Sequence, residues 1–440
     1  MISQAEFESQ ERDLVESVGG KAIDAPTLVI GKWSTTLYGF VEADNIFDTT
    51  QSFVDLAGNN QVARPGTLAG NNARYTAGVR NSRIGFRIRA PEFHKVRTSA
   101  MIEMDFLGNQ AGTSEAAIFT TPVFRVRHMM LKIETPIVDI MFGQYWHLFG
   151  WQSLYNPNTV EIQGVPGEIY SRTPQIRLSK TVKTDAITFE AALAMSRSPQ
   201  RDSIAPEGEA GVRLAFNKWK TLQTMGSTGT TVSPLSIAVT GDIRHFELPE
   251  FKSSAVNTVG KNGYAFAVDA FIPIIPVTDS RKSNALSINA EYSWSTGAAD
   301  LFTQLNGGVS NPALPTPMGA TTAPTYNADV DSGLVAVNAD GTFNTIQWQS
   351  ALVGLQYYLP GLNGRSWVSG NYSHMESSNS KYHGSPKSVR SSLDWADANI
   401  FADVTPSVRL GLEYAWFHDT YVDGVSADNH RVQFSAFYIF

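Results

Sequence analysis

Seven arginines lie at alternating positions or on neighbouring segments within a short part of the sequence. A guanidinium group is always charged, and its planar fork pairs with a carboxylate or a phosphate through two hydrogen bonds. Residues two apart point to the same face of a β-strand, so this spacing predicts a basic wall that recognises small anions. The seven residues are Arg83, Arg87, Arg89, Arg97, Arg125, Arg127 and Arg177.

Acidic residues on adjacent segments leave a second interpretation open. Glu42, Asp44, Glu103 and Asp105 would lie beside the arginines, where they would pair with them and merely brace the wall. Bracing and anion selectivity are compatible, because one guanidinium group has five donors to share. Glu103 and Asp105 are therefore predicted to form the acidic side of the same site.

The segments that carry these residues have a hydrophobic period of two, which is typical of β-strands with one apolar face. In segment 82–90, for example, Ile84, Phe86 and Ile88 share one face and the arginines share the other. Sixteen segments follow this pattern and are predicted to be strands. They are 35–47, 82–90, 96–107, 124–134, 138–146, 174–183, 186–196, 210–217, 234–246, 262–273, 284–295, 344–358, 366–375, 390–403, 407–418 and 429–440.

An even number of long strands predicts an all-β fold, a 16-stranded antiparallel transmembrane β-barrel. Only 17% of the 440 residues are charged, and no apolar run is long enough for a membrane helix. Short and long connections alternate, as in outer-membrane barrels. One exception is the long connection 218–233, which stands where a short turn is expected and indicates a misassigned strand in that region. A soluble β-sandwich or propeller would have shorter strands and, in a propeller, a visible repeat.

The connection 147–173 is predicted to be the third external loop, folded inward. A 16-stranded barrel encloses a wide aqueous channel unless something narrows it. The loop would set Tyr155, Glu161, Glu168 and Tyr170 against the arginines and create a transverse field. The alternative is that the loop stays outside. The longest loop, 296–343, would cover the mouth, pack on a neighbouring protomer or move freely.

Residues 1–33 are predicted to be a periplasmic N-terminal extension, and residues 34–440 the barrel. Met1 to Gly20 is acidic and polar, so no signal peptide is expected in this chain. With 34 basic and 41 acidic residues, the chain has no net positive field for nucleic acid.

Catalysis, cofactors and metals are not expected. None of the eight histidines lies in a GxSxG or HExxH motif, and His128 is predicted on the face opposite Arg125 and Arg127. The spacing of Asp423 and Asp428 differs from that of a calcium-binding EF-hand. An outer-membrane enzyme, a plugged transporter and an adhesin whose loops form the active surface are the competing functions.

Several passages resemble the DcaP-like trimeric porins of Gram-negative outer membranes. The resemblance implies a homotrimer, surrounded by outer-membrane lipid or lipopolysaccharide, that passes small anionic or dicarboxylate-like solutes through a basic constriction. Arg83, Arg87, Arg125, Arg127 and Arg177 lie in matching motifs, whereas the long N-terminal coiled coil of that family is at most vestigial here. The passages are 124–150, 287–309, 346–360 and 403–440.

Overall fold

The structure is a computed structural model of the chain. None of the helices among the described residues is long and apolar enough to cross a membrane. The described residues are 27–108, 121–161, 164–201, 203–226, 229–277, 283–305, 314–323, 330, 333–382 and 384–440.

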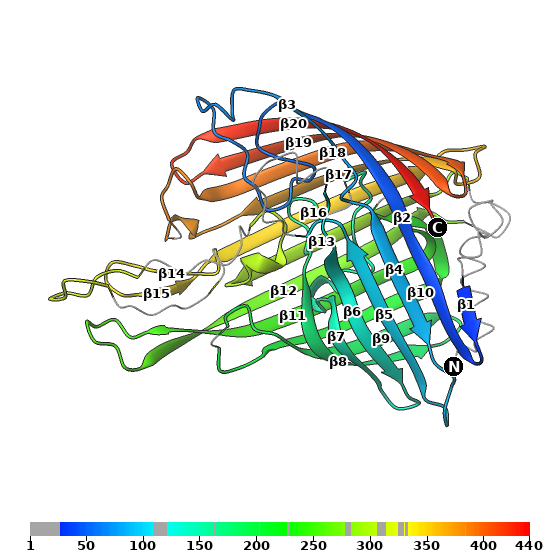
Figure 1. Ribbon diagram of the computed structural model, residues 1–440, viewed down its shortest axis with the longest axis horizontal. Helices are drawn as coiled ribbons and strands as arrows, with labels where there is room; N and C mark the ends of the chain where they lie inside the picture. The colour runs from blue at the N-terminus through cyan, green and yellow to red at the C-terminus, as the bar shows by residue number, and fades with distance from the viewer. Residues whose placement is uncertain are drawn as a thin grey trace.

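Sixteen strands of the described chain close into an antiparallel barrel, each paired with its neighbours along the sequence (Figure 1). The last strand pairs with the first, so the sheet has no free edge. The strands are β2 (Trp33–Asp48), β4 (Arg83–Arg89), β5 (Arg97–Asp105), β6 (Arg125–Glu134), β7 (Asp139–Trp146), β8 (Arg172–Lys183), β9 (Ile187–Ser196), β10 (Glu207–Met225), β11 (Gly229–Pro249), β12 (Thr258–Ile275), β13 (Leu286–Thr296), β16 (Gln347–Tyr358), β17 (Ser366–Glu376), β18 (Arg390–Thr405), β19 (Val408–Tyr421) and β20 (Ser426–Ile439).

Smaller elements decorate the barrel. Strand β3 pairs with the second half of β2, beyond the part of β2 that pairs with β4. Strands β14 and β15 form a separate hairpin. In Figure 1 this hairpin lies at the end of the barrel opposite the C-terminus and β1. These elements are β1 (Thr27–Ile30), β3 (Arg74–Gly78), β14 (Val335–Val337), β15 (Phe343–Thr345) and the short 3₁₀ helices η1 (Phe149–Trp151), η2 (Ala299–Leu301) and η3 (Ser380–Tyr382).

The alternation along each strand separates an apolar outer face from a polar inner face. On β19, Leu412 and Tyr414 are exposed on the outside, whereas Glu413 between them is buried inside. The same separation holds on β20, where Val432 and Phe434 face outward and Gln433 faces inward. An apolar band around a closed sheet is what a bilayer requires, so the predicted fold class is confirmed.

All sixteen predicted strands are present, and the exceptional connection 218–233 has a simple explanation. Strands β10 and β11 continue into it as far as the pair of Met225 with Gly229. No strand was misassigned. The alternation of short and long connections has one exception, because 276–285 between β12 and β13 is no shorter than 250–257 between β11 and β12. Residues 27–30, predicted to lie outside the strand pattern, pair as β1 with the beginning of β2. Residues 1–26 of the predicted extension lie outside the described residues, and the division at residue 33 stays a prediction.

Candidate functional site

Three adjacent strands bring arginines and carboxylates together on the inner face of the barrel. Arg83 of β4 lies opposite Asp105 of β5, which lies opposite Arg125 of β6. The Nε of Arg83 is 3.6 Å from Glu103 Oε1, and the Nη2 of Arg125 is 2.5 Å from Asp105 Oδ2. Together with Arg127, these residues are called the arginine–carboxylate cluster below.

Arg127 is the buried centre of the cluster. Its Nε donates to Glu103 Oε1 at 2.8 Å and its Nη1 donates to Asp105 Oδ2 at 3.4 Å. Its side chain is 1% exposed, against 38% for Arg125. Arg127 therefore braces the two carboxylates, whereas Arg125 still presents its charge to the lumen.

A β-bulge in β6 places two successive side chains on the inside. The register with β5 slips between Glu103 and Met104, and Arg127 is the extra residue. His128 consequently faces inward beside Arg127, with its Nε2 3.8 Å from Glu103 Oε1 and its ring 4.8 Å from that of Tyr145. The prediction that His128 lies on the opposite face was wrong, because it assumed an uninterrupted period of two.

The third loop, here residues 147–171 between β7 and β8, supplies Tyr170 to the cluster. The Nη2 of Arg127 donates to the Tyr170 hydroxyl at 3.2 Å. Burial by itself raises the pKa of Tyr170, but the positive charges of Arg127, Arg172 and Arg83 outweigh burial and lower it below its usual value. The guanidinium groups of Arg127 and Arg172 both lie over the ring of Trp146, with their Cζ atoms 5.6 and 5.2 Å from its centroid.

Two other predicted arginines lie on the same wall, nearer the periplasmic end. Arg87 stacks over the ring of Tyr38 at 4.3 Å, and Arg177 donates from Nε to Gln175 Oε1 at 2.9 Å. Arg89 and Arg97 lie near the strand ends, and Arg97 is 3.8 Å from Glu134 across the pair β5 and β6. The seven arginines thus follow one wall, but only Arg83, Arg125 and Arg127 share the cluster.

The predicted acids and Tyr155 of the third loop lie against other partners. Glu161 accepts from Arg431 Nη1 at 3.0 Å, and burial raises its pKa although Arg431 opposes this. Glu168 accepts from the Val165 amide at 3.0 Å, and burial raises its pKa well above the usual value. The Tyr155 hydroxyl donates to Ser236 on β11. These three side chains do not meet the arginine–carboxylate cluster.

The third loop instead crosses the inner face of the strands from β10 to β20, called the packed wall below. The Gly150 amide donates to Thr240 Oγ1 on β11, and the Asn158 carbonyl accepts from Ser369 on β17. Further along, the Gly167 carbonyl accepts from Ser350 on β16. The loop therefore lies against the wall opposite the arginines.

Three inward carboxylates of the packed wall hold the loop backbone, and sequence reasoning missed all of them. Glu209 on β10 accepts from the amides of residues 148 and 149, and Glu413 on β19 accepts from those of residues 160 and 161. Glu291 on β13 accepts from the Ile169 amide. The period of two places each acid inside, but no local signal identifies its loop partner.

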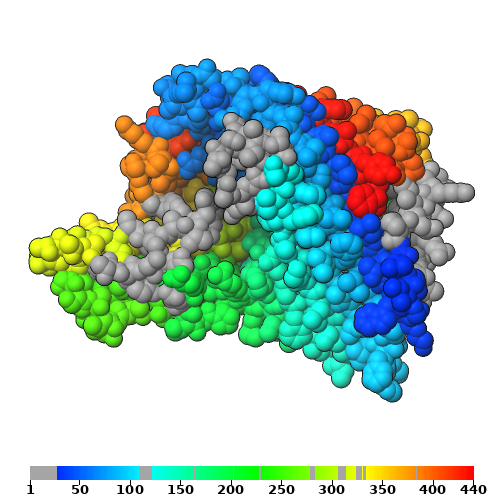
Figure 2. Space-filling view, viewed as in Figure 1, coloured from blue at the N-terminus to red at the C-terminus, as the bar shows by residue number. Residues whose placement is uncertain are grey.

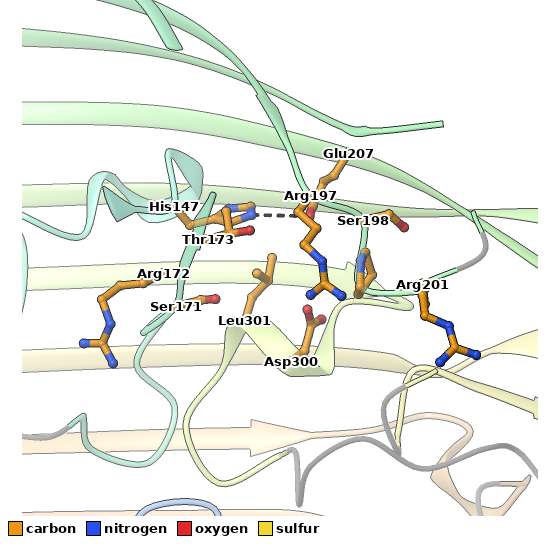
Figure 3. A pocket seen from close by; sticks show the side chains of 11 residues that line it. His147, Ser171, Arg172, Thr173, Arg197, Ser198, Arg201, Glu207, Asp300 and Leu301 are labelled. Carbon is orange, nitrogen blue, oxygen red and sulfur yellow. Dashed lines mark ion pairs between the residues drawn. The ribbon is translucent and has the colours of Figure 1, made fainter. Parts of the chain in front are cut away.

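A cavity of about 230 Å³ lies next to the cluster at the external ends of β8 and β10 (Figure 3). His147 lies at its edge, with its Nε2 3.4 Å from Glu207. Burial by itself lowers the pKa of His147, but the negative charges of Glu209 and Glu207 outweigh burial and raise it well above its usual value. Arg172 connects the cavity to the cluster through Trp146 and Tyr170. The lining residues are His147, Ser171, Arg172, Thr173, Arg197, Ser198, Pro199, Arg201, Glu207, Asp300 and Leu301.

No protein-family model and no curated protein sequence matches the chain. In structure the chain is similar to the outer membrane channel DcaP of Acinetobacter baumannii, with a TM-score of 0.66 and 17% identity over 94% of this chain and 99% of that chain. It is also similar to an anion-selective porin from Comamonas acidovorans (TM-score 0.50, 10% identity, 93% of this chain and 100% of that chain).

A third similar structure is the trimer form of OmpT, an outer membrane protein of Vibrio cholerae. Its TM-score is 0.50 and its identity 11%, over 93% of this chain and 99% of that chain. These likenesses show a shared barrel fold. The resemblance to DcaP-like porins that the sequence indicates is confirmed at this level.

Proposed function

We propose that the chain is an outer-membrane channel that passes small anionic solutes, above all carboxylates, along the basic wall. The observation that carries this proposal is the charge balance around Tyr170. Four guanidinium groups gather there, from Arg83, Arg125, Arg127 and Arg172, against the two carboxylates of Glu103 and Asp105. A lumen that is positive at this point attracts anions and raises their local concentration.

The roles within the cluster differ with exposure. Arg127 is buried and holds Glu103, so it positions the wall, whereas Arg125 and Arg83 are the groups that a solute meets. A carboxylate passing along the wall would exchange its water for hydrogen bonds from Arg125, and it would leave again because Asp105 competes for the same donors. The bracing interpretation and the selectivity interpretation therefore apply to different arginines.

The third loop is proposed to narrow the channel by occupying the side of the lumen opposite the cluster. Its hydrogen bonds to β10, β13 and β19 support this position. The neighbours whose names describe an outer membrane channel and a porin support transport, rather than hydrolysis, as the activity. They also support the location of this chain in the outer membrane of a Gram-negative bacterium, where outer-membrane lipid or lipopolysaccharide would surround the barrel.

A homotrimer is proposed as the assembly, supported by the trimer form of one similar structure. Heating samples before electrophoresis tests it, because a barrel trimer migrates as a heat-labile band. A single band at the monomer position, with and without heating, would contradict the trimer and leave the channel proposal intact.

Single-channel recording in planar bilayers with a salt gradient tests the channel itself. The full chain is expected to give open steps with a reversal potential on the anion side. Arg125→Gln is expected to move that potential toward zero, since it removes the most exposed charge of the cluster. Arg64→Gln is the matched control, because Arg64 pairs with Asp423 on external loops. A silent trace would contradict the channel, and equal effects of both variants would contradict the anion site.

A further inference from the structure

The periplasmic hairpin, defined as residues 217–226 at the end of β10 and 229–233 at the start of β11, bends away from the barrel wall. Phe216 pairs with Leu235, but the next pair joins Lys220 to Pro234, so residues 217–219 have no partner on β11. An insertion of this kind bends a strand, and Pro234 has no amide hydrogen to continue the ladder. The sequence therefore encodes a change of direction at the periplasmic end.

Burial shows that the bend is inward. Four successive residues, Thr221 to Thr224, are between 0 and 2% exposed. A hairpin that extended into the periplasm would expose one or both faces, because successive side chains of a strand point to opposite sides. Burial of both faces means that the hairpin is covered by the wall on one side and by another segment on the other.

Hydrogen bonds identify the wall side. The Thr221 hydroxyl donates to the Ile275 carbonyl at the end of β12. The Thr224 amide donates to Gln356 Oε1 on β16 at 2.8 Å, and Gln356 Nε2 donates back to the Thr224 carbonyl at 2.9 Å. Since β16 is separated from β11 by two strands, the hairpin reaches across the inner face of β12 and β13.

The other side of the hairpin meets the tip of the third loop. Gln223 Nε2 donates to the Leu154 carbonyl at 3.0 Å, and the Gly226 amide donates to the Pro157 carbonyl at 2.9 Å. Asn158 Nδ2 returns a bond to the Gly226 carbonyl at 2.6 Å. The loop enters from the external end and the hairpin from the periplasmic end, so they meet inside the barrel.

An apolar cluster seals the meeting point. Leu222 of the hairpin and Val160 of the loop, both 0% exposed, share it with side chains from β2, β16, β17, β18 and β20. Buried apolar side chains that pack together exclude water from the space between them. The other members are Phe40, Val277, Ala285, Tyr358, Trp367, Phe401 and Phe437.

We propose that the periplasmic hairpin is a second specificity-determining element, which sets the size limit of the channel. It covers the part of the periplasmic mouth next to the packed wall, and it supports the tip of the third loop from the periplasmic side. Solutes that pass the arginine–carboxylate cluster then leave along the inner face of the remaining wall, β4 to β9. Figure 2 shows the outer surface of this part of the barrel. This inference rests on the proposed channel function.

Replacement of residues 217–234 by Asn-Gly, which joins Phe216 to Leu235 in a regular tight turn, tests the proposal. The variant is expected to conduct roughly twofold more per channel and to admit larger neutral sugars in liposome swelling, since pore width sets both. Conductance and size limit equal to those of the unaltered chain would overturn the inference. An unaltered chain that does not conduct would instead overturn the proposed function.

Cysteine accessibility provides a readout that does not depend on conduction or on the deletion folding. The chain has no cysteine, so a single introduced one can be followed. Thr224→Cys is expected to resist a water-soluble thiol reagent in the folded barrel, whereas Lys218→Cys, on the exposed part of the hairpin, is expected to react. Equal labelling of both variants would show that the hairpin is not seated inside and would overturn the inference.

Discussion

The two walls of the lumen use carboxylates in opposite ways. On the basic wall, Glu103 and Asp105 pair with guanidinium groups from neighbouring strands and leave a surplus of positive charge. On the packed wall, Glu209, Glu291 and Glu413 accept backbone amides of the third loop. The role of an inward acid therefore depends on its partner. Acids that pair with guanidinium groups adjust the charge of the lumen, whereas acids that accept backbone amides hold the third loop.

Loss of Glu413 is expected to have the largest effect on stability and conductance, because the third loop loses one of its attachments to the packed wall. Glu413→Ala leaves the buried Glu161 amide without an acceptor, which costs about 1–3 kcal/mol, whereas the Val160 amide keeps Asn399 Oδ1 at 3.0 Å. Denaturant unfolding followed by electrophoresis measures the loss. Single-channel records are expected to show larger and noisier steps, since the loop is released.

Glu376→Ala is the matched control for Glu413→Ala. Glu376 ends β17 and its side chain is 52% exposed, so its removal is expected to change neither unfolding nor conductance measurably. Equal destabilisation by both variants would contradict the claim that the carboxylates of the packed wall anchor the loop.

Neutralising an acid on the basic wall is expected to increase anion selectivity. Glu103→Gln removes the partner shared by Arg83 and Arg127, so the net charge of the cluster becomes more positive by one. We expect roughly a doubling of the anion-to-cation permeability ratio, measured from reversal potentials at low salt, where the field is least screened. Asp423→Asn changes the formal charge equally, but Asp423 pairs with Arg64 on external loops away from the cluster, so this variant should shift the ratio less.

A smaller effect is expected from pH, through Tyr170. A phenol is neutral below its pKa and negative above it, and the lowered pKa means that Tyr170 ionises before an ordinary tyrosine, whose pKa is about 10. As pH rises toward that value, its negative charge beside Arg127 should reduce anion selectivity. Reversal potentials measured against pH should show this decline in the unaltered chain and lack it in Tyr170→Phe. Identical curves would contradict the assigned contact.

The sequence predicts the sheet better than the site, for a physical reason. A strand with one face in lipid cannot hold charge there, so each of the sixteen strands carries its own signal, as segment 82–90 does. The bulge at Arg127, by contrast, changes one register step and reverses the side on which His128 lies.

Long-range contacts are equally invisible in local patterns. Glu161 and Arg431 are 270 residues apart and meet only because the barrel closes and the loop crosses it. The hairpin was predicted as an irregular connection because its burial on both faces removes the alternation that identifies a membrane strand. The register shift of β10 opposite Pro234, which bends the hairpin, is visible in the structure but not in the local sequence pattern.

The smallest effect should come from Arg97, which belongs to the predicted basic wall but lies at the end of β5. Its side chain is 43% exposed and lies 3.8 Å from Glu134, whose side chain is 30% exposed. Exposed ion pairs contribute about 0–1 kcal/mol, and water screens their field. Arg97→Gln should therefore change the reversal potential less than Arg125→Gln does, with stability nearly unchanged. An equal shift would mean that selectivity arises from the whole length of the wall, and that the arginine–carboxylate cluster has no special place in it.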